Sequence, residues 1–349
     1  MPQRTSNSLL PEWAPQQAVL LAWPHENTDW APWLPQIEAD YILLTQAISE
    51  QANALILCQD QAHKLRVSER LAGHCKLPPT LLVQPYNDTW CRDYGPLTLS
   101  EKSSLQLLNF QFNGWGEKYH AGLDNGVNQA LKPLWAAPLV NVEFELEGGS
   151  VETDGLGTLL TTRHCLLESQ RNKQFTQQQI ETQILAYLGL DRVLWLNNGA
   201  LLGDGTDSHI DNLARFCDPD TIAYASCNDS DDPHFEPLTA MEKELKQFRT
   251  RDGKPYRLVP VEIPDAQYNE EGSRLPASYI NFLILNHCVL VPVFNCSRDE
   301  KALQGLQGCF PTRKIVPVPG GNLIRQFGGP HCATMQLPNQ TVKQQVFNP

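Results

Sequence analysis

The sequence predicts an α+β fold made of small units, each with two or three strands and one helix, repeated around a centre. The composition is that of a globular protein, with 41% hydrophobic and 19% charged residues in a chain of 349. Strand-like runs outnumber helical ones by about a dozen to five, which does not suit a simple alternating βαβ sheet. No linker, charge block or low-complexity segment divides the chain, so we expect residues 1–349 to form a single domain.

Helices are predicted where apolar residues recur three or four positions apart. The segments with this pattern are 36–51, 61–71, 177–188, 238–249 and 299–306. Strands are predicted where short apolar or β-branched runs are bounded by turn-forming residues. These runs are 18–22, 55–58, 80–83, 105–112, 141–146, 158–162, 193–196, 222–225, 258–263, 282–284, 289–294 and 314–317. No fixed period is visible in the sequence, so the repetition is inferred from the number of elements.

Charge and cysteine content exclude several classes of function. The net charge is −12 and no Lys/Arg cluster occurs, which argues against a nucleic-acid surface. The longest apolar stretch, 280–294, is interrupted by Asn281 and Pro292 and is too short and polar to span a membrane. Residues 1–12 lack the apolar core of a signal peptide. None of the ten cysteines forms a Cys-x-x-Cys pair, so neither a zinc ribbon nor a thioredoxin-like site is indicated. We expect a reduced, cytoplasmic protein whose cysteines are mostly buried.

Cys332 is the candidate nucleophile. It follows Gly328 and Gly329, which allow a strained turn or close backbone approach, and it directly follows His331. The flanking His331 and Thr334 are too polar for an ordinary core strand. A buried structural thiol is the alternative, as for the other nine cysteines.

His209 and Asp211 are two positions apart and follow a turn rich in Gly and Asp, 202–207. If this segment is extended, as the apolar Ile210 and Leu213 permit, the side chains of His209 and Asp211 point in the same direction. A surface loop with local hydrogen bonds is the alternative for this motif taken by itself.

Two further carboxylates stand in short polar turns. Glu147 ends the strand-like run 141–146 and precedes two glycines, a common way to project a charge into a cleft. Asp93 lies close to Trp90 and Arg92, and such dense charge costs solvation unless the charges pair or bind a ligand. A solvated turn is the alternative for Glu147, and Arg92 is a candidate ion-pair partner of Asp88.

Two generic sites use the same residue types. A zinc site would contain Cys, His, Asp and Glu, but the motifs lack the local ligand pairs typical of zinc proteins. A Cys–His–Asp protease triad would leave Asp93 and Glu147 without a role, and no papain-like or caspase-like sequence surrounds Cys332. One thiol, one His and three carboxylates instead match what is needed to bind a planar guanidinium cation and attack its central carbon.

These motifs resemble the agmatine deiminase family, which is related to the bacterial peptidylarginine deiminases among the guanidine-modifying enzymes. The matching segments occur in order along almost the whole chain: 11–13 (PEW), 23–25 (WPH), 88–96 (DTWCRDYGP), 112–116 (FNGWG), 146–150 (LEGGS), 203–211 (GDGTDSHID) and 328–334 (GGPHCAT). The resemblance implies a five-bladed α/β propeller of pseudo-fivefold ββαβ-type units with a central active site.

The resemblance also implies the role of each site residue. Cys332 is the nucleophile and His209 the general acid and base. Asp93 and Asp211 bind the guanidinium nitrogens, and Glu147 orients His209 or shares in that binding. The expected reaction passes through a covalent amidino-cysteine and requires no cofactor or metal. Because nearby carboxylates disfavour a thiolate, we expect Cys332 to remain a thiol until the cationic substrate arrives.

Agmatine is the expected substrate, converted to N-carbamoylputrescine and ammonia on the route to polyamines. Trp90 and Trp115 are candidates to hold its distal amine by cation–π attraction, although either can instead be a core residue. A peptidylarginine or another guanidine is the alternative substrate, and a non-catalytic binder of guanidinium or polyamine ligands is the alternative of a different class. Intact Cys332 and His209 favour an enzyme. No nucleic-acid or membrane partner is expected, and a homodimer is compatible with the resemblance.

Overall fold

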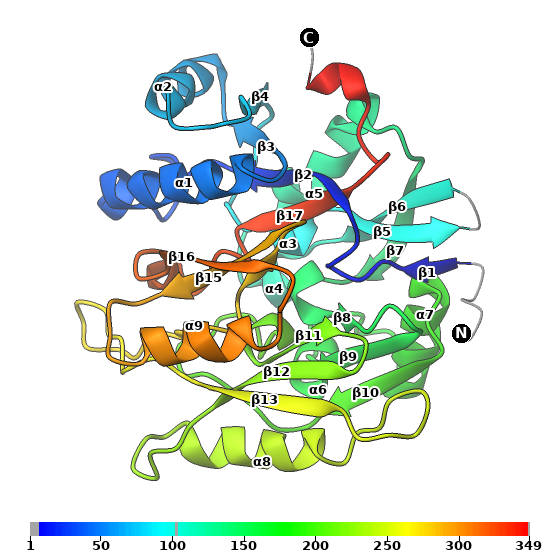
Figure 1. Cartoon of the computed structure of the whole chain (residues 1–349). Coiled ribbons are helices and arrows are strands. Elements are labelled where there is room, and N and C mark those ends of the chain that lie inside the picture. Colours follow the sequence, from blue (N-terminus) through cyan, green and yellow to red (C-terminus); the bar gives the residue numbers. More distant parts are fainter. Residues whose placement is uncertain (1–6, 102–103, 348–349) are drawn as a thin grey trace.

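Within residues 7–101 and 104–347, the part of the chain described by this computed structural model, the strands form five sheets (Figure 1). The first contains β1 (Asn7–Leu9), β5 (Leu97–Glu101), β6 (Ser104–Gln111) and β7 (Leu139–Glu145). The second contains β8 (Glu152–Thr153), β9 (Thr158–Thr162) and β10 (Arg192–Leu196). The third contains β11 (Ala214–Asp218), β12 (Thr221–Ser226) and β13 (Arg257–Glu262). The fourth contains β14 (Leu283–Ile284), β15 (Cys288–Val293) and β16 (Lys314–Pro319). The fifth contains β17 (Thr334–Pro338), β2 (Gln16–Ala22), β3 (Asn53–Cys58) and β4 (Thr80–Val83).

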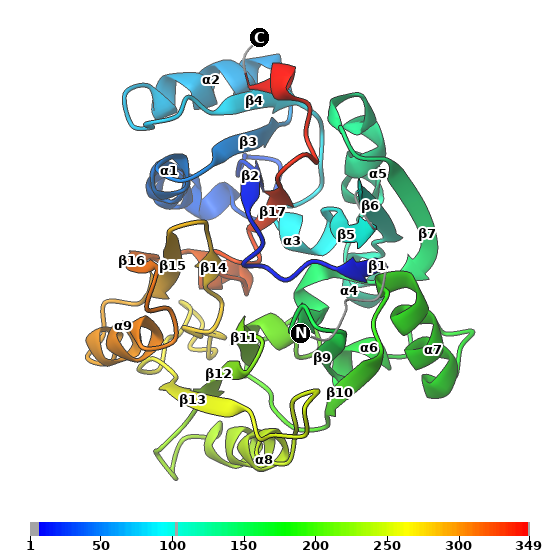
Figure 2. The ribbon, with the colours of Figure 1, turned by 45° about the vertical axis from the view of Figure 1, so that its right-hand side comes forward.

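All five sheets share one pairing pattern. An antiparallel pair is followed by a parallel pair, and a helix connects the two parallel strands. The connecting helices are α1 (Leu34–Ser49), α5 (Gly122–Ala130), α7 (Gln177–Leu188), α8 (Phe235–Leu245) and α9 (Asp299–Gln307). Figure 2 shows these helices at the periphery, with the antiparallel strands nearer the middle. The chain therefore has a mixed α/β fold, as the element count indicated.

Shorter elements complete the described chain. The remaining helices are α2 (Gln61–Leu71), α3 (Cys91–Tyr94), α4 (Gly114–Glu117) and α6 (Arg163–Leu166). The 3-10 turns are η1 (Ala31–Trp33), η2 (Lys132–Leu134), η3 (Gly148–Ser150), η4 (Ile210–Asn212), η5 (Leu323–Gln326) and η6 (Gln344–Val346). In the described ranges, no helix combines the length and the apolar character needed to cross a membrane.

Local sequence explains why the predicted helices form. In α7, the Thr176 side chain accepts a hydrogen bond from the Gln179 backbone N–H, and the Gln179 side chain reaches back to the Thr176 backbone, which is a capping box. Ile184 and Leu188 are buried along one face, and the helix ends at Gly189 in the left-handed conformation that glycine adopts without strain. The predicted boundaries of this helix are therefore confirmed.

Other boundaries differ from the prediction. Helix α8 begins at Phe235 rather than at Leu238, and α5 was not predicted. Glycines at 122 and 126 give α5 low intrinsic helix propensity, so tertiary packing of Val127 stabilises it instead.

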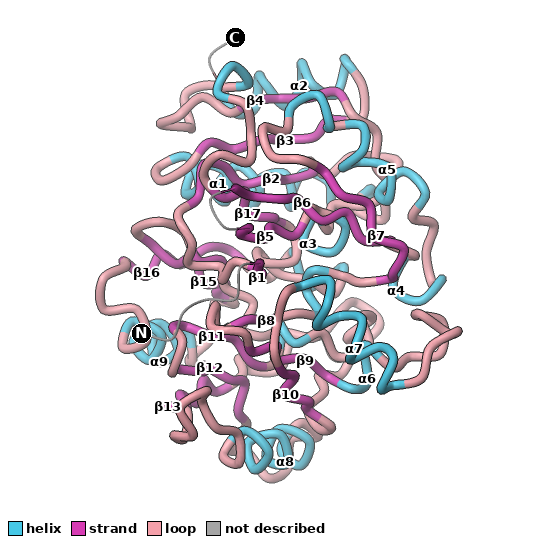
Figure 3. Tube along the Cα trace, turned by 90° about the vertical axis from the view of Figure 1, so that its right-hand side faces the viewer, coloured by secondary structure: helices cyan, strands magenta, loops and turns pink. Residues whose placement is uncertain are grey.

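The last strand of the described chain pairs with its second strand. Strand β17 pairs antiparallel with β2, with Met335 opposite Leu20 and Thr334 opposite Leu21 (Figure 3). Strand β2 is buried along its whole length, as is usual for strands covered on both faces. This pairing places Cys332, just before β17, close to the N-terminal segment of the chain.

The candidate catalytic and guanidinium-binding residues, together with Asn281, occupy equivalent positions in the five sheets. Each lies in the turn directly before the first strand of an antiparallel pair. The turns before β5, β8, β11, β14 and β17 carry, respectively, Asp93, Glu147, His209 with Asp211, Asn281, and Cys332. One topological position, used five times, thus supplies side chains from distant parts of the sequence to one place.

Candidate active site

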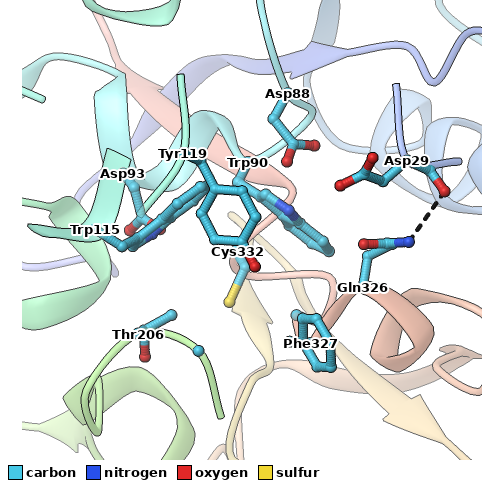
Figure 4. Close-up of a pocket in the computed structure, with 12 residues that line it drawn as sticks. Asp29, Asp88, Trp90, Asp93, Trp115, Tyr119, Thr206, Gln326, Phe327 and Cys332 are labelled. Carbon is cyan, nitrogen blue, oxygen red and sulfur yellow. Dashed lines mark hydrogen bonds between the residues drawn. The ribbon is translucent and has the colours of Figure 1, made fainter. Parts of the chain in front are cut away.

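Cys332 lies at the bottom of a pocket and is 4% exposed. Its Sγ accepts a hydrogen bond from Asn281 Nδ2 at 3.0 Å and contacts Asp211 Oδ2 at 3.3 Å. Figure 4 shows the sulfur directed into the pocket, with Trp115 and Phe327 on opposite sides of it. Burial, reinforced by Asp211 and Asp93, raises the pKa of Cys332 well above its ordinary value. Before substrate binds, Cys332 is therefore a thiol at neutral pH.

His209 precedes the 3-10 turn η4, so the expectation of an extended His209–Asp211 segment was wrong. Asp207 and Ser208 have positive φ angles of 66° and 67°, and Asp204 accepts the Ser208 backbone N–H. These features bend the chain sharply before His209. Its side chain is fully buried, and neither ring nitrogen has a hydrogen-bond partner.

Carboxylates surround the His209 ring. Nδ1 lies 3.6 Å from Asp93 Oδ1, and Nε2 lies 4.0 Å from Glu147 Oε2. Burial by itself lowers the pKa of His209, but Asp93, Cys165 and Glu147 outweigh burial and raise that pKa well above its ordinary value. The imidazole is therefore protonated at rest and able to donate a proton.

One carboxylate oxygen of Asp211 has hydrogen-bond partners, and the other has none. Its Oδ2 contacts His331 Nδ1 at 2.8 Å and Cys332 Sγ at 3.3 Å. Its Oδ1 is buried and has no hydrogen-bond partner. Burial opposes ionisation, but the hydrogen bond from His331 and the charges around it lower the pKa of Asp211. A buried anionic oxygen without a donor is costly, so this atom is suited to accept an N–H from a ligand.

Asp93 is held in α3 by two donors. Trp115 Nε1 donates to its Oδ2 at 2.8 Å, and the Gly149 backbone N–H donates to its Oδ1 at 2.9 Å. Burial, together with Asp211 and Glu147, raises the pKa of Asp93 to about 6 although His209 opposes the change. A bound cation would favour the ionised form of this carboxyl group.

The suggested pairing of Arg92 with Asp88 was wrong. Arg92 Nε donates to the His331 carbonyl at 3.3 Å, and the Asp88 side chain accepts the Thr89 backbone N–H at 2.7 Å. Arg92 points away from Asp88 because it is buried beneath β17 against Met335.

Glu147 is fixed by a buried arginine. Arg171 Nε donates to Glu147 Oε1 at 2.7 Å, while Arg171 Nη1 donates to Asp207 at 2.7 Å. The other oxygen of Glu147, Oε2, faces His209 and lies 4.0 Å from Cys165 Sγ. Arg171 therefore holds the turn before His209 together with the carboxylate that His209 faces.

The pocket above Cys332 is lined by aromatic and acidic side chains. Its lining residues are Asp29, Asp88, Trp90, Asp93, Trp115, Tyr119, Gly205, Thr206, Gln326, Phe327, Gly328 and Cys332. No lysine or arginine is among them. In Figure 4, Asp29 and Gln326 lie on the other side of Cys332 from Asp93 and Trp115. Trp115 thus belongs to the Asp93 end of the pocket.

Comparison with known proteins agrees with this geometry. A sequence profile of the Porphyromonas-type peptidyl-arginine deiminase family matches residues 8–338. An agmatine deiminase of Pseudomonas syringae pv. tomato is 31% identical, over 94% of each chain. The chain belongs to the family of Porphyromonas-type peptidyl-arginine deiminases and agmatine deiminases. The family resemblance suggested by the motifs is confirmed.

Solved structures of this deiminase family share the fold. A structure described as a candidate peptidyl-arginine deiminase is 41% identical, with a TM-score of 0.92, over 96% of this chain and 99% of that chain. A variant of the C. jejuni agmatine deiminase, solved with substrate bound, is 36% identical with a TM-score of 0.89 over 97% of each chain. The similarity therefore covers every turn that carries a candidate site residue.

Two buried groups in this deiminase have metal-ligand chemistry. Glu147, Cys165 and His209 place ligand atoms within 4.8 Å of one another, and so do Glu12, Glu152 and His331. In each group an arginine already pairs with a carboxylate: Arg171 with Glu147, and Arg215 with both Glu12 and Glu152. We therefore assign neither group to a metal.

Sequence reasoning missed three contributors to this deiminase site. Asn281 contacts Cys332, Cys165 contacts Glu147, and Arg171 holds Glu147 in place. Asn281 had a visible signal because it interrupts an apolar run that otherwise reads as core. Cys165 and Arg171 had no such signal. Cys165 lies in α6 and Arg171 follows α6, and the contact of this segment with the site depends on the tertiary fold.

The raised pKa of Cys332 makes a testable prediction for the free enzyme. Only the thiolate is alkylated, so a raised pKa leaves little reactive form at neutral pH and more as the pH rises. We expect the inactivation rate with iodoacetamide to be low at pH 7 and still rising beyond pH 9. A rate that levels off below a pH of about 8.5, the ordinary thiol value, would contradict this expectation.

Proposed function

We propose that this chain is an agmatine deiminase, a C–N hydrolase that converts agmatine and water to N-carbamoylputrescine and ammonia. The observation that carries the proposal is a set of buried polar atoms without partners beside Cys332. Asp211 Oδ1 and both ring nitrogens of His209 lack hydrogen bonds, and Asp93 lies 3.6 Å from His209. A guanidinium group presents N–H donors in a planar fork that two carboxylates can accept, which holds its carbon against the sulfur.

The first half of the reaction forms a covalent adduct. The substrate's charge lowers the pKa of Cys332, the thiol proton leaves to solvent, and the thiolate attacks the guanidinium carbon. His209 transfers its proton to one nitrogen of the tetrahedral adduct, and the C–N bond breaks to release ammonia. An amidino group remains bonded to Cys332 Sγ. Glu147 and Asp93 stabilise the protonated imidazole that this step consumes.

The second half releases the product. His209, now neutral, takes a proton from a water molecule that attacks the same carbon. The C–S bond breaks, the remaining hydroxyl proton passes to the departing Cys332 sulfur, and the carbon keeps the new oxygen as a urea carbonyl. One water is consumed and one ammonia released per turnover, so the enzyme returns to its starting state.

The end of the pocket opposite Asp93 and Trp115, the far end, favours agmatine over arginine. Asp88 lies there, and burial raises its pKa to about 7, which a nearby ammonium would lower again. Arginine would bring an α-carboxylate towards Asp88 and Asp29, with no lining lysine or arginine to pair with it. The agmatine deiminase relatives support the same choice. Trp90 lines this pocket and we infer that it contacts the aliphatic chain or the distal amine of agmatine.

We further infer that residues 1–349 form a single catalytic domain arranged as a five-bladed propeller. The five sheets with one shared pairing pattern support this, as do the five equivalent turns that point to one site. Pairing of β17 with β2 would close the ring by joining the two ends of the chain.

The test compares ammonia release from agmatine, free arginine and a blocked arginyl peptide. We expect turnover of agmatine alone. In Asp88→Asn, we expect kcat/KM for agmatine to fall about 10- to 100-fold, the worth of a hydrogen bond to a charged group. Asp252→Asn, which removes an exposed carboxylate outside the pocket, is the matched control and should retain wild-type kcat/KM.

Each other result has a distinct meaning. Turnover of the peptide would keep the chemistry and replace agmatine as the substrate. Equal turnover of arginine and agmatine would show that the acidic far end does not select against the α-carboxylate of arginine. Agmatine binding without ammonia release would indicate a non-catalytic binder.

A further inference from the structure

The side chain of His331 lies between two buried carboxylates. Its Nδ1 is 2.8 Å from Asp211 Oδ2, and its Nε2 is 2.8 Å from Glu12 Oε2. His331 is 1% exposed, Asp211 is fully buried, and Glu12 is 9% exposed. Glu12 comes from the N-terminal segment between β1 and β2. This segment therefore contacts His331, the residue before Cys332, through the Glu12 carboxylate.

Both contacts are short enough to require a proton. A neutral imidazole carries one N–H, so it can donate to only one carboxylate and would present a lone pair to the other. Two anionic oxygens at hydrogen-bond distance are satisfied together only by an imidazolium, which donates from both nitrogens. Glu12 cannot supply the missing proton cheaply, because its carboxylate also accepts from Ile284 N–H at 2.7 Å and from Arg215.

Cations and carboxyl groups from several elements surround His331. Asp211 comes from η4, Glu12 from the N-terminal segment, Arg215 from β11 and Arg92 from α3, while Glu152 from β8 pairs with Arg215 and has an oxygen within 4.8 Å of a His331 ring nitrogen. With His331 as an imidazolium, three cations stand among two carboxylates and Glu152, whose pKa burial raises to about 7. Burial, Arg215 and Arg92 outweigh Glu12 and Asp211 and lower the pKa of His331 from its ordinary value, which by itself favours the neutral ring. The two 2.8 Å contacts are what favour the protonated form.

We propose that Glu12 and His331 are positioning residues of the reaction: Glu12 holds His331 as a buried imidazolium, and His331 holds Asp211 ionised with its Oδ2 fixed. The inference rests on the proposed deiminase function for its consequence. With Oδ2 fixed between His331 and Cys332, Oδ1 is the oxygen left for the guanidinium group. The N-terminal segment thereby sets the charge of a carboxylate that it does not touch.

The first experiment measures the proton on His331 without using activity. The full-length protein is labelled with ¹⁵N-histidine, and the His331 signal is assigned by its loss in His331→Gln. We expect both ring nitrogens to carry a proton at neutral pH in the wild type. In Glu12→Gln an imidazolium would lack one counter-charge, so we expect one ring nitrogen to lose its proton.

Glu152→Gln is the matched control. Glu12 and Glu152 are both buried carboxyl groups paired with Arg215 and within 4.8 Å of His331, but only Glu12 lies at hydrogen-bond distance from the His331 ring, at 2.8 Å. Burial raises the pKa of Glu152 to about 7, so its removal changes the charge near His331 less. We expect Glu152→Gln to retain the doubly protonated ring, with both variants compared at similar thermal stability.

The kinetic readout is the pH profile of kcat/KM for agmatine. Loss of the imidazolium beside Asp211 raises the pKa of Asp211, so its protonation begins at higher pH. We expect the acidic limb to move to higher pH in Glu12→Gln and to stay in place in Glu152→Gln. A neutral His331 ring in the wild type, or equal shifts in both variants, would overturn the proposal. If agmatine is not the substrate, the NMR result still stands and only the kinetic arm fails.

Discussion

Replacing Cys332 with alanine is expected to abolish ammonia release from agmatine. In the proposed mechanism, the sulfur bonds to the guanidinium carbon, and the second half of the reaction requires its departure. Loss of a covalent nucleophile removes a whole pathway, so we expect kcat to fall on the order of 10⁴-fold or more. Agmatine should still bind, because the carboxylates of Asp93 and Asp211 remain. Steady-state ammonia release and equilibrium binding of agmatine measure the two effects separately.

A matched control distinguishes this loss from general damage. Cys75→Ala removes a partly buried thiol that does not line the pocket, and we expect nearly unchanged kcat. In the wild type, acid quenching during turnover should leave an amidino group on the peptide that contains Cys332, detectable by mass. Residual turnover in Cys332→Ala within about 10-fold of wild type would exclude nucleophilic catalysis by this residue.

Adding one methyl group at Gly149 is expected to have the second largest effect. A Cβ at this position would lie 2.5 Å from His209 Nδ1, 2.8 Å from Asp93 Oδ1 and 3.1 Å from Asp211 Oδ2. Three side chains of the reaction centre would have to move at once. Because displacements of about 1 Å at a reacting centre can cost about 100-fold, we expect Gly149→Ala to lower kcat/KM by at least that factor.

The same substitution elsewhere provides the control. Gly126 is exposed within α5 and a Cβ there would meet no atom within 4 Å. Gly126→Ala should therefore keep full activity and stabilise α5 by up to about 1 kcal/mol through helix propensity. Thermal unfolding of both variants separates local displacement from unfolding. Full activity in Gly149→Ala would show that the reaction centre tolerates the shift.

The five equivalent turns explain why these effects converge. Each turn precedes a short antiparallel strand, so its side chain is fixed by sheet pairing on one side and by its neighbours on the other. The Gly149 N–H holds Asp93, the Arg92 N–H holds the Cys332 carbonyl at 3.1 Å, and Asn281 holds Cys332 Sγ. Contacts between turns therefore position the reacting groups.

Several elements were predictable because their signals are local. The helices at 61–71 and 177–188 were placed at their observed bounds, since helical periodicity and capping depend on neighbouring residues. The parallel strands were found because they are apolar along their length. The turns containing Cys332, Glu147 and Asp93 stood out because glycines lie beside polar residues where a core would have neither.

Five strands, β1, β5, β8, β11 and β17, were not predicted. They are short and contain buried polar residues such as Thr98, Arg215 and Thr334, so neither an apolar run nor a clean alternation appears. The buried charge of Arg215 is paired with Glu12 and Glu152, which are distant in sequence. A pattern of period two cannot reveal such strands.

The sequence by itself determined the chemistry of this protein: one thiol, one imidazole and three carboxylates in ordered motifs, within a mixed α/β chain of a known family. Only the tertiary structure decided which atoms are free to meet a substrate. Asp211 Oδ1 lacks a partner because His331 and Cys332 occupy Oδ2, and His331 does so because Glu12 lies on its other side. Charge and hydrogen-bond satisfaction depend on distances of a few ångströms between residues hundreds of positions apart, and those distances exist only in the folded chain.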